Sequence, residues 1–218
     1  MDKRLIEIRT ALMKGAAPAV RELVSACLDK GIPPDRILEE GMVSAMAIIG
    51  ERFKRDEIYM PEVMIAARAM NAGLEVLEPA LVQSGAKPRG KVLLASVRAD
   101  LHDIGKNMVA MMFRGAGYSV VDLGVDVHED LILEAIAEHE PDVVGLSSLL
   151  TTTLPNMKKT VETLEKADLR GRVIIMVGGA PVTPEFAEGI GADGYAPDSA
   201  SAVERAAELL AARGQGLA

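Results

Sequence analysis

One histidine in a short polar segment is the best candidate for chemistry in this sequence. Residues 100–105 read Asp-Leu-His-Asp-Ile-Gly and follow an apolar run, 91–97, that is typical of a buried strand. A helical pattern comes next, which predicts a strand-to-helix loop, the place where α/β folds bind ligands. His102 could present one ring nitrogen to a metal while Asp100 holds the other and fixes the tautomer. This arrangement favours axial ligation of a cofactor metal.

Small and hydroxyl residues follow two further strand-like runs. The segment Ser147-Ser148-Leu149 comes at the end of the strand-like run that starts at residue 143, and a row of threonines, 151–153, extends this polar segment. Gly178 and Gly179 come after the fourth run, and glycines let a backbone approach a ligand closely because they have no Cβ. Each signal alone also fits residues that only satisfy loop backbone. We expect all of them at the carboxyl ends of strands in one sheet, which makes a shared ligand site the better interpretation.

The elements that position these residues alternate between strand and helix in the second half of the chain. The predicted strands are 92–97, 119–123, 143–147, 173–177 and 194–196. The predicted helices are 104–115, 129–139, 154–167, 184–189 and 199–213. Such alternation predicts a five-stranded parallel sheet in a Rossmann-like (flavodoxin-like) α/β domain with right-handed crossovers.

The first half of the chain reads as helices. Apolar stripes predict helices near 5–12 and 20–28, a third over 33–49 that opens at two prolines, and a fourth that begins at Pro61. Residues 51–57 are predicted as a polar break and residues 83–90 as a linker. The pattern indicates an N-terminal four-helix bundle, with domain boundaries at 1–85, 86–90 for the linker, and 91–218.

Composition restricts the classes of partner. The 218 residues carry a net charge of −8 without a basic tract, which disfavours nucleic acid and anionic membranes. Cys27 is the single cysteine, so no internal disulfide can form, and it is expected to be buried. No signal peptide or apolar run of about 20 residues is present, so we expect a cytoplasmic protein.

The three segments together resemble a family signature. The pattern Asp-X-His-X-X-Gly, then Ser-X-Leu, then Gly-Gly resembles the cobalamin-binding signature of corrinoid proteins. The segments 59–62, Tyr-Met-Pro-Glu, and 66–70, Ala-Ala-Arg-Ala-Met, resemble the helical cap of the same family. The layout is similar to the cobalamin-binding module of methionine synthase. It is more similar still to the free-standing corrinoid proteins of methanol, methylamine and O-demethylase methyltransferase systems.

The resemblance implies roles for individual residues. His102 would replace the cofactor's own dimethylbenzimidazole as the lower cobalt ligand, the base-off, His-on state. Asp100 would hydrogen-bond the imidazole, and Thr153 would complete a triad with them. The family's pattern further implies a set of residues around the cofactor and its nucleotide tail. The residues that would contact the cofactor or its tail are Asp103, Ile104, Gly105, Ser147, Leu149, Thr151, Gly178, Gly179, Ala196 and Asp198. In the cap, Met60 and Met64 would cover the upper, methyl-bearing face.

The implied function is a methyl carrier. It would receive a methyl group through a donor-specific methyltransferase and deliver it through a second one that acts on tetrahydrofolate or a thiol. A reductive activating protein would be a further partner. No zinc-ligand set or second titratable cluster indicates a complete catalyst. The alternative is a cobalamin-dependent sensor or transcriptional regulator, in which we would expect a DNA-binding domain and a cap tryptophan, but the chain has no Trp. A mutase subunit would lack the helical cap.

Overall fold

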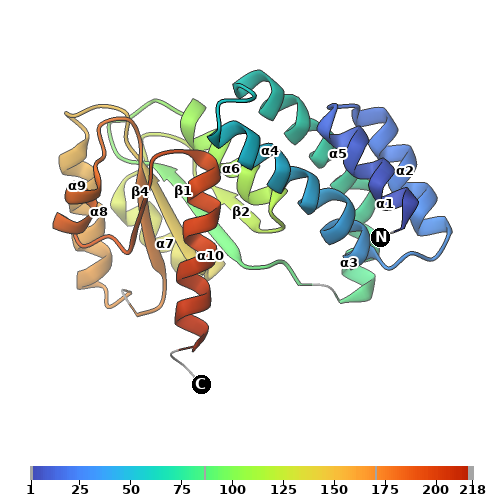
Figure 1. The fold of residues 1–218 in the computed structure, drawn as a ribbon. Coiled ribbons are helices and arrows are strands. Elements are labelled where there is room, and N and C mark those ends of the chain that lie inside the picture. The colour runs from blue at the N-terminus through green and yellow to red at the C-terminus, as the bar shows by residue number, and fades with distance from the viewer. Residues whose placement is uncertain (1, 86, 170, 216–218) are drawn as a thin grey trace. The chain divides into compact units, whose positions relative to one another are not determined.

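The computed structural model describes residues 2–85, 87–169 and 171–215 (Figure 1). The chain divides into two compact units, Met1–Arg89 with Arg114–Tyr118, and Gly90–Phe113 with Ser119–Ala218. The chain passes from the first unit to the second between Arg89 and Gly90, and the linker 86–90 stays a prediction. Residues 1, 86, 170 and 216–218, which the predicted boundaries include, lie outside the described part.

The first unit is helical, as predicted. Its helices are α1 Lys3–Met13, α2 Ala17–Asp29, α3 Pro34–Arg36, the π-helix η1 Ile37–Val43, α4 Ser44–Lys54 and α5 Met60–Ser84. Leu5, Ile8 and Leu12 recur at helical spacing on α1 and are fully buried. Asp2 caps α1 by accepting the backbone N–H of Arg4 at 2.9 Å. Cys27 on α2 is buried, as expected.

Two predictions about helix ends in this unit were wrong. The polar break was expected from residue 51, but α4 continues to Lys54, and Arg55 and Glu51 form an i,i+4 ion pair at 3.3 Å. Glu, Arg and Lys are good helix formers, so their polarity indicated exposure and not a break. The linker was expected from residue 83, but α5 runs to Ser84 and ends at Gly85, whose φ of 70° is a left-handed C-terminal cap.

The second unit is a parallel sheet with helices on both faces, as predicted. The strands are β1 Lys91–Ser96, β2 Ser119–Asp122, β3 Val143–Ser147, β4 Ile174–Gly178 and β5 Gly194–Ala196. The helices are α6 Ile104–Gly115, α7 Glu129–His139, α8 Leu154–Lys166, α9 Pro184–Gly189 and α10 Ser199–Gln215. All neighbouring strands are parallel and their order is β2-β1-β3-β4-β5. The order reverses between β1 and β3, and this switch point is where such sheets bind ligands.

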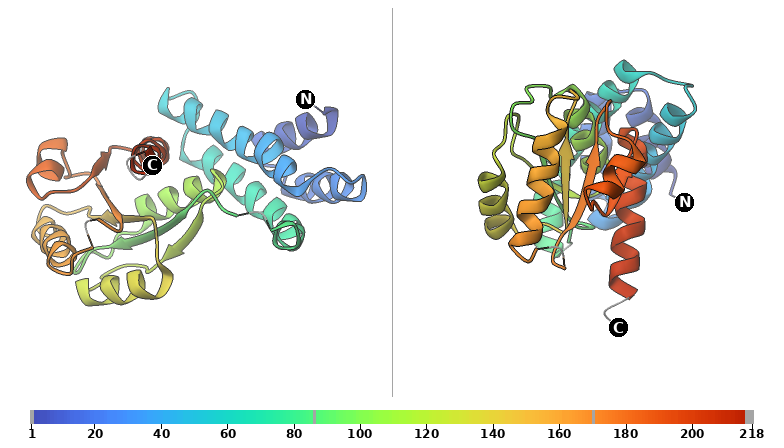
Figure 2. Two further views of the ribbon diagram at one scale, coloured as in Figure 1. Left: turned by 90° about the horizontal axis from the view of Figure 1, so that it is seen from below. Right: turned by 90° about the vertical axis from the view of Figure 1, so that its left-hand side faces the viewer.

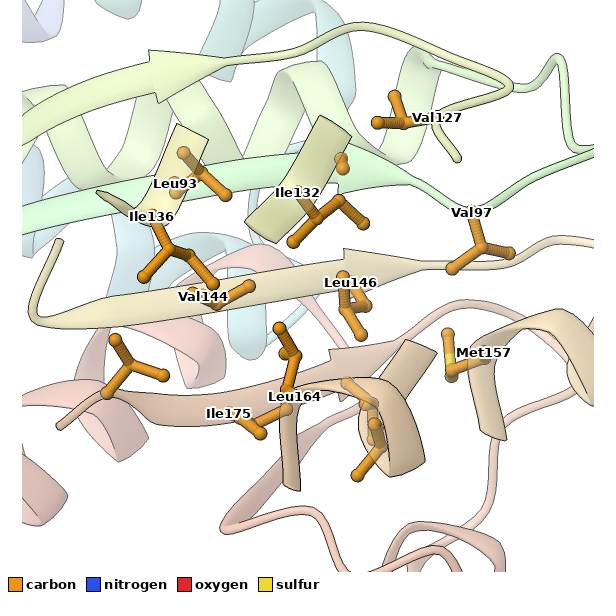
Figure 3. Packing of buried hydrophobic residues seen from close by; sticks show 14 of the residues in the cluster. Leu93, Val97, Val127, Ile132, Ile136, Val144, Leu146, Met157, Leu164 and Ile175 are labelled. Carbon is orange, nitrogen blue, oxygen red and sulfur yellow. The ribbon is translucent and has the colours of Figure 1, made fainter. Parts of the chain in front are cut away.

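One continuous apolar core lies between the sheet and α7 and α8. Figure 3 shows Ile132 and Ile136 of α7 and Leu164 of α8 beside the sheet residues Leu93 and Val144. In Figure 2, α6 and α10 lie on the opposite face of the sheet from α7 and α8. Burial on both faces explains the nearly continuous apolar strands. Among the described residues, no helix combines the length and hydrophobicity that crossing a bilayer would require.

Candidate functional site

The carboxyl ends of four strands lie in one row. Ser96 at the end of β1 is paired in register with Ser147 at the end of β3. Ser147 is paired with Gly178 of β4, and Gly178 with Ala196 of β5. The loops that carry the predicted site residues therefore leave the same edge of the sheet. This juxtaposition is the one that the strand pattern predicted.

Asp100 and His102 form a close pair in the loop between β1 and α6. Oδ1 of Asp100 lies 2.9 Å from Nδ1 of His102 and accepts the His102 backbone N–H at 3.0 Å. The Asp100 side chain is 1% exposed, whereas that of His102 is 48% exposed. With Nδ1 protonated and engaged by the carboxylate, the lone pair of Nε2 remains for a ligand.

The second carboxylate oxygen of Asp100 is held by the loop after β3. Oδ2 accepts the Leu149 backbone N–H at 2.7 Å and the Thr153 hydroxyl at 2.9 Å. Thr153 is buried and lies directly before α8. The structure therefore brings together the aspartate, histidine and hydroxyl that the family resemblance implied as a triad.

Ser148 joins this cluster; the sequence pointed to it only as part of the segment Ser147-Ser148-Leu149, and the site role was predicted for Ser147. It is fully buried, and its Oγ lies 2.7 Å from the Thr153 Oγ1. Ser147, the residue chosen from the motif, is the last residue of β3 and is only partly buried. Ser147 ends β3, whereas Ser148 follows the strand and lies against Thr153, so the two serines have different surroundings. The feature of the sequence that could have identified Ser148 is a polar residue directly after an apolar strand.

Hydrogen bonds lower the pKa of Asp100. Burial alone would raise this pKa, but hydrogen bonds from the Leu149 and His102 backbone and from the His102 and Thr153 side chains outweigh it, lowering the pKa from 3.8 to about 2. The carboxylate therefore stays ionised at neutral pH. It favours the imidazole tautomer with its proton on Nδ1, which leaves the lone pair on Nε2.

The backbone of the histidine loop is fixed by two further polar side chains. The Ser96 hydroxyl donates to the His102 carbonyl at 2.8 Å. Asp126 accepts the Ala99 backbone N–H at 2.6 Å and donates its own N–H to the Asp100 carbonyl at 2.9 Å. Ala99 has a φ of 64°, an unfavourable conformation for alanine that this hydrogen bond supports. Sequence analysis did not identify Ser96 or Asp126.

The glycines at the edge have different surroundings. Gly179 has a φ of 121°, and a Cβ there would lie 1.9 Å from the Ser148 carbonyl oxygen. A Cβ at Gly178 would lie 3.1 Å from the Ala196 carbonyl oxygen. At Gly105 a Cβ would meet no protein atom within 4 Å. The first two glycines are required by the protein's own packing, whereas Gly105 leaves open space at the start of α6.

The far end of the row is the turn from β5 into α10. Asp198 accepts the backbone N–H groups of Ala200 and Ser201, both at 2.9 Å, and therefore caps α10. Ala196 is buried. In the described part of the chain, the Ser199 Oγ is a buried oxygen for which the structure shows no hydrogen-bond partner. The structure gives Asp198 a structural task beyond the ligand contact expected from the sequence.

Comparison with known proteins decides the family. Two family profiles, each described as a B12 binding domain, match residues 90–204 and 6–78. A corrinoid protein of Desulfitobacterium hafniense is 36% identical over 209 residues, which cover 94% of this chain and 97% of that protein. A dimethylamine corrinoid protein of Methanosarcina acetivorans is 41% identical over 179 residues, covering 82% and 84%. The chain belongs to the corrinoid proteins.

Solved structures have the same fold as this corrinoid protein. A chain of the methanol:cobalamin methyltransferase complex from Methanosarcina barkeri aligns with a TM-score of 0.85 at 29% identity, covering 96% of this chain and 80% of that one. A cobalamin-binding protein from Desulfitobacterium hafniense aligns with a TM-score of 0.78 at 31% identity, covering 94% and 96%. The expected family, fold and cofactor, cobalamin, are therefore confirmed.

The edge of the sheet in this corrinoid protein suits a large, partly apolar ring with a metal at its centre. Exposed apolar side chains lie in the loops at this edge and at the start of α6; they are Leu101, Ile104, Val125, Leu149 and Leu150. Large apolar groups exposed together at a strand edge are typical of a ligand surface. Histidine is a suitable nitrogen donor for cobalt, and open space at Gly105 leaves room beside it. The residues present therefore fit the cofactor of the family.

The remaining predicted residues are spread over both units. Asp103 lies directly before α6, and its Oδ2 accepts the Asn107 side-chain amide at 3.0 Å. Thr151 is exposed in the loop after β3. Met60 and Met64 are exposed at the start of α5, in the first unit.

Replacing Asp100 by Asn should destabilise the corrinoid protein at pH 7 by about 2 kcal/mol, the value of a pKa shift near two units. Because the folded-state pKa lies below the unfolded value of 3.8, the ionised carboxylate stabilises the fold above about pH 4 and loses this effect as the pH falls towards 2. The difference between wild type and Asp100→Asn, measured by urea unfolding, should therefore shrink over that range.

The control for this experiment is Asp130→Asn, at a side chain that is 73% exposed. It should change the unfolding free energy by less than about 0.5 kcal/mol at either pH. An Asp100→Asn effect that is equally large at pH 7 and near pH 2 would contradict the hydrogen-bonding explanation.

Proposed function

We propose that this corrinoid protein is a methyl carrier that works between two methyltransferases. A donor-specific methyltransferase would load it, and a second one, acting on tetrahydrofolate or a thiol, would unload it, with a reductive activating protein as a further partner. Two comparisons support this role: relatives named for dimethylamine and trimethylamine, and a structural relative in a methanol:cobalamin methyltransferase complex. We propose a cytoplasmic location and no nucleic acid partner.

The observation that carries the proposal is the Asp100–His102 pair at the carboxyl edge. When bound, cobalamin supplies a cobalt ion that accepts and releases a methyl group. In the base-off, His-on arrangement we propose, Nε2 of His102 is the lower cobalt ligand. Asp100 keeps the ring proton on Nδ1, 2.9 Å from its carboxylate, and Thr153 and the Leu149 backbone orient that carboxylate.

The other residues would contact the rest of the cofactor. Asp103 ends the loop between β1 and α6 (residues 97–103, the ligand loop), and Ile104 and Gly105 begin α6. We propose that the nucleotide tail runs along the strand ends, with contacts from Ser147, Leu149, Thr151, Gly178, Gly179, Ala196 and Asp198. In the helical cap domain, 1–85, joined by the linker 86–90 to the cofactor domain 91–218, Met60 and Met64 would shield the methyl-bearing face.

A transfer experiment tests the carrier role. The cobalamin-loaded, reduced protein is incubated with a candidate methyltransferase and its donor labelled in the methyl group, drawn from methanol, methylamines, betaines and aryl methyl ethers. We expect label to elute with the protein for one donor–enzyme pair and to pass to tetrahydrofolate or a thiol when the second enzyme is added. The protein without cobalamin is the control and should take up no label.

Two outcomes would contradict the proposal. The first is the absence of label on the loaded protein with every donor class. The second is tight, sequence-specific DNA binding that depends on cobalamin, which would favour the regulator instead.

A further inference from the structure

A buried lysine lies at the start of α6, directly after the ligand loop. The Lys106 side chain, on the first turn of α6, is only 3% exposed. Lysine is almost never fully buried without a partner, because removing an ammonium group from water is costly. The roles described so far for the site do not use this residue.

Three acceptors surround the Lys106 ammonium group. Nζ donates to Oδ1 and Oδ2 of Asp122, at the end of β2, over 2.5 and 2.6 Å, and to Oδ1 of Asn107 over 2.9 Å. An ammonium group has three protons, so these contacts match its donor capacity. The pair connects the start of α6 to the end of β2.

The same network reaches the residue that follows His102. The Asn107 side-chain amide, whose oxygen accepts from Lys106, donates through its nitrogen to Oδ2 of Asp103 at 3.0 Å. The Asn107 backbone N–H also donates to the Asp103 carbonyl, at 2.7 Å. Lys106 thus orients Asn107, which holds Asp103.

A second route runs through the end of β2 to His102 itself. Oδ1 of Asp122 accepts the Gly124 backbone N–H at 2.9 Å, and the Gly124 carbonyl accepts the Ser96 backbone N–H at 3.0 Å. The Ser96 hydroxyl in turn donates to the His102 carbonyl at 2.8 Å. The Lys106–Asp122 pair is therefore connected to the ligand loop at two points, Asp103 and the His102 carbonyl.

We propose that Lys106 is a positioning residue for His102; this inference rests on the proposed role of His102 as the cobalt ligand. Asp100, Thr153 and Leu149 hold the loop from the side of β3. Lys106 and Asp122 hold it from the side of β2, so that the imidazole ring keeps one direction. Removal of the ammonium group leaves the Asp122 carboxylate and the Asn107 amide oxygen without their donor, and the first turn of α6 and the loop before it lose this support.

A second lysine–carboxylate pair in the same unit provides a matched control. Lys159 on α8 pairs with Glu129 of α7, whose side chain is 5% exposed. Lys159→Met removes the same charge and takes the lysine partner from the Glu129 carboxylate, as Lys106→Met does for Asp122. The Lys159–Glu129 pair has no hydrogen bond to residues 100–107 among those that the structure describes. The two variants therefore separate a general loss of stability from a change at His102.

The experiment compares wild type, Lys106→Met, Lys159→Met and His102→Ala after reconstitution with cobalamin. For each we measure the visible absorption spectrum, the dissociation constant of cobalamin and the thermal unfolding midpoint. Both lysine variants should unfold at lower temperature. Lys106→Met alone should convert part of the bound cobalamin to the spectrum of His102→Ala and weaken cobalamin binding about tenfold, the lower end for loss of an outer hydrogen-bond partner of a metal ligand.

The other possible results would contradict either this inference or the assignment of His102 as the ligand. Wild-type spectra and affinity for Lys106→Met would overturn the inference and leave Lys106 as a stability element, as would equal spectral changes in both lysine variants. Identical spectra for wild type and His102→Ala would instead refute the ligand assignment under the proposed function. If Lys106→Met does not fold, Asp122→Asn, which keeps the side-chain shape, replaces it. The same partial spectral conversion is then expected, and a wild-type spectrum would overturn the inference.

Discussion

His102→Ala should abolish the lower protein ligand of bound cobalamin. The visible spectrum of the reconstituted variant should be that of cobalamin without a histidine ligand, whereas the wild-type protein should show histidine ligation. Loss of the ligand should weaken cobalamin binding by at least about 10- to 100-fold, because the loss of even an outer partner of a metal ligand has an effect of this size. Absorption spectroscopy and equilibrium dialysis would measure the two effects.

His139→Ala is the matched control. His139 is the last residue of α7 and lies near the amino edge of the sheet, where its carbonyl accepts from Lys91 at the start of β1. The control should keep the wild-type spectrum and affinity. If His102→Ala also keeps the wild-type spectrum, His102 is not the cobalt ligand.

Gly179→Ala should have the largest effect on the fold of the second unit. The new Cβ would lie 1.9 Å from the Ser148 carbonyl oxygen, and the φ of 121° is strained for alanine. The loop after β3 must shift, and Ser148 then moves relative to Thr153. We expect a loss of at least about 3 kcal/mol in unfolding free energy, measured by urea denaturation. Weakened cobalamin binding should accompany it.

Gly105→Ala provides the contrast. A Cβ at Gly105 would meet no protein atom within 4 Å, so the unfolding free energy of the cofactor-free protein should change by less than about 1 kcal/mol. Cobalamin affinity should nevertheless fall if the cofactor lies against the start of α6. Equal stability losses for the two glycine variants would show that the close approach of Gly179 to Ser148 is not the cause.

The strand pattern and the motif spacing were sufficient to predict the parallel sheet and the edge of it at which the candidate site lies. Parallel strands end at one edge, so Asp100, Ser147 and Gly178 could be expected to lie close together from their positions after apolar runs. The helix ends in the first unit were harder to predict. The charged residues near Glu51 are good helix formers, and polarity alone does not separate an exposed helix from a loop.

The supporting residues of the site could not be predicted, because their roles depend on contacts between distant segments. Asp122 is the last residue of β2, and Lys106 looks like an ordinary surface lysine in the sequence, yet their side chains meet in the fold. Ser148 was obscured by its neighbour Ser147, since the motif does not say which serine points towards Thr153. His102, the proposed cobalt ligand, had a local signature in the sequence, whereas the residues that hold its loop are brought there only by tertiary structure.

The loop after β3 also affects how the sequence can change in length. Leu149 and Thr153 both donate to the same Asp100 oxygen, so the number of residues between β3 and α8 is fixed by two contacts to another loop. The turns at the amino edge of the sheet carry none of these contacts and can vary as ordinary surface loops do. We therefore expect this domain to tolerate inserted residues in the turns at the amino edge of the sheet but not between β3 and α8.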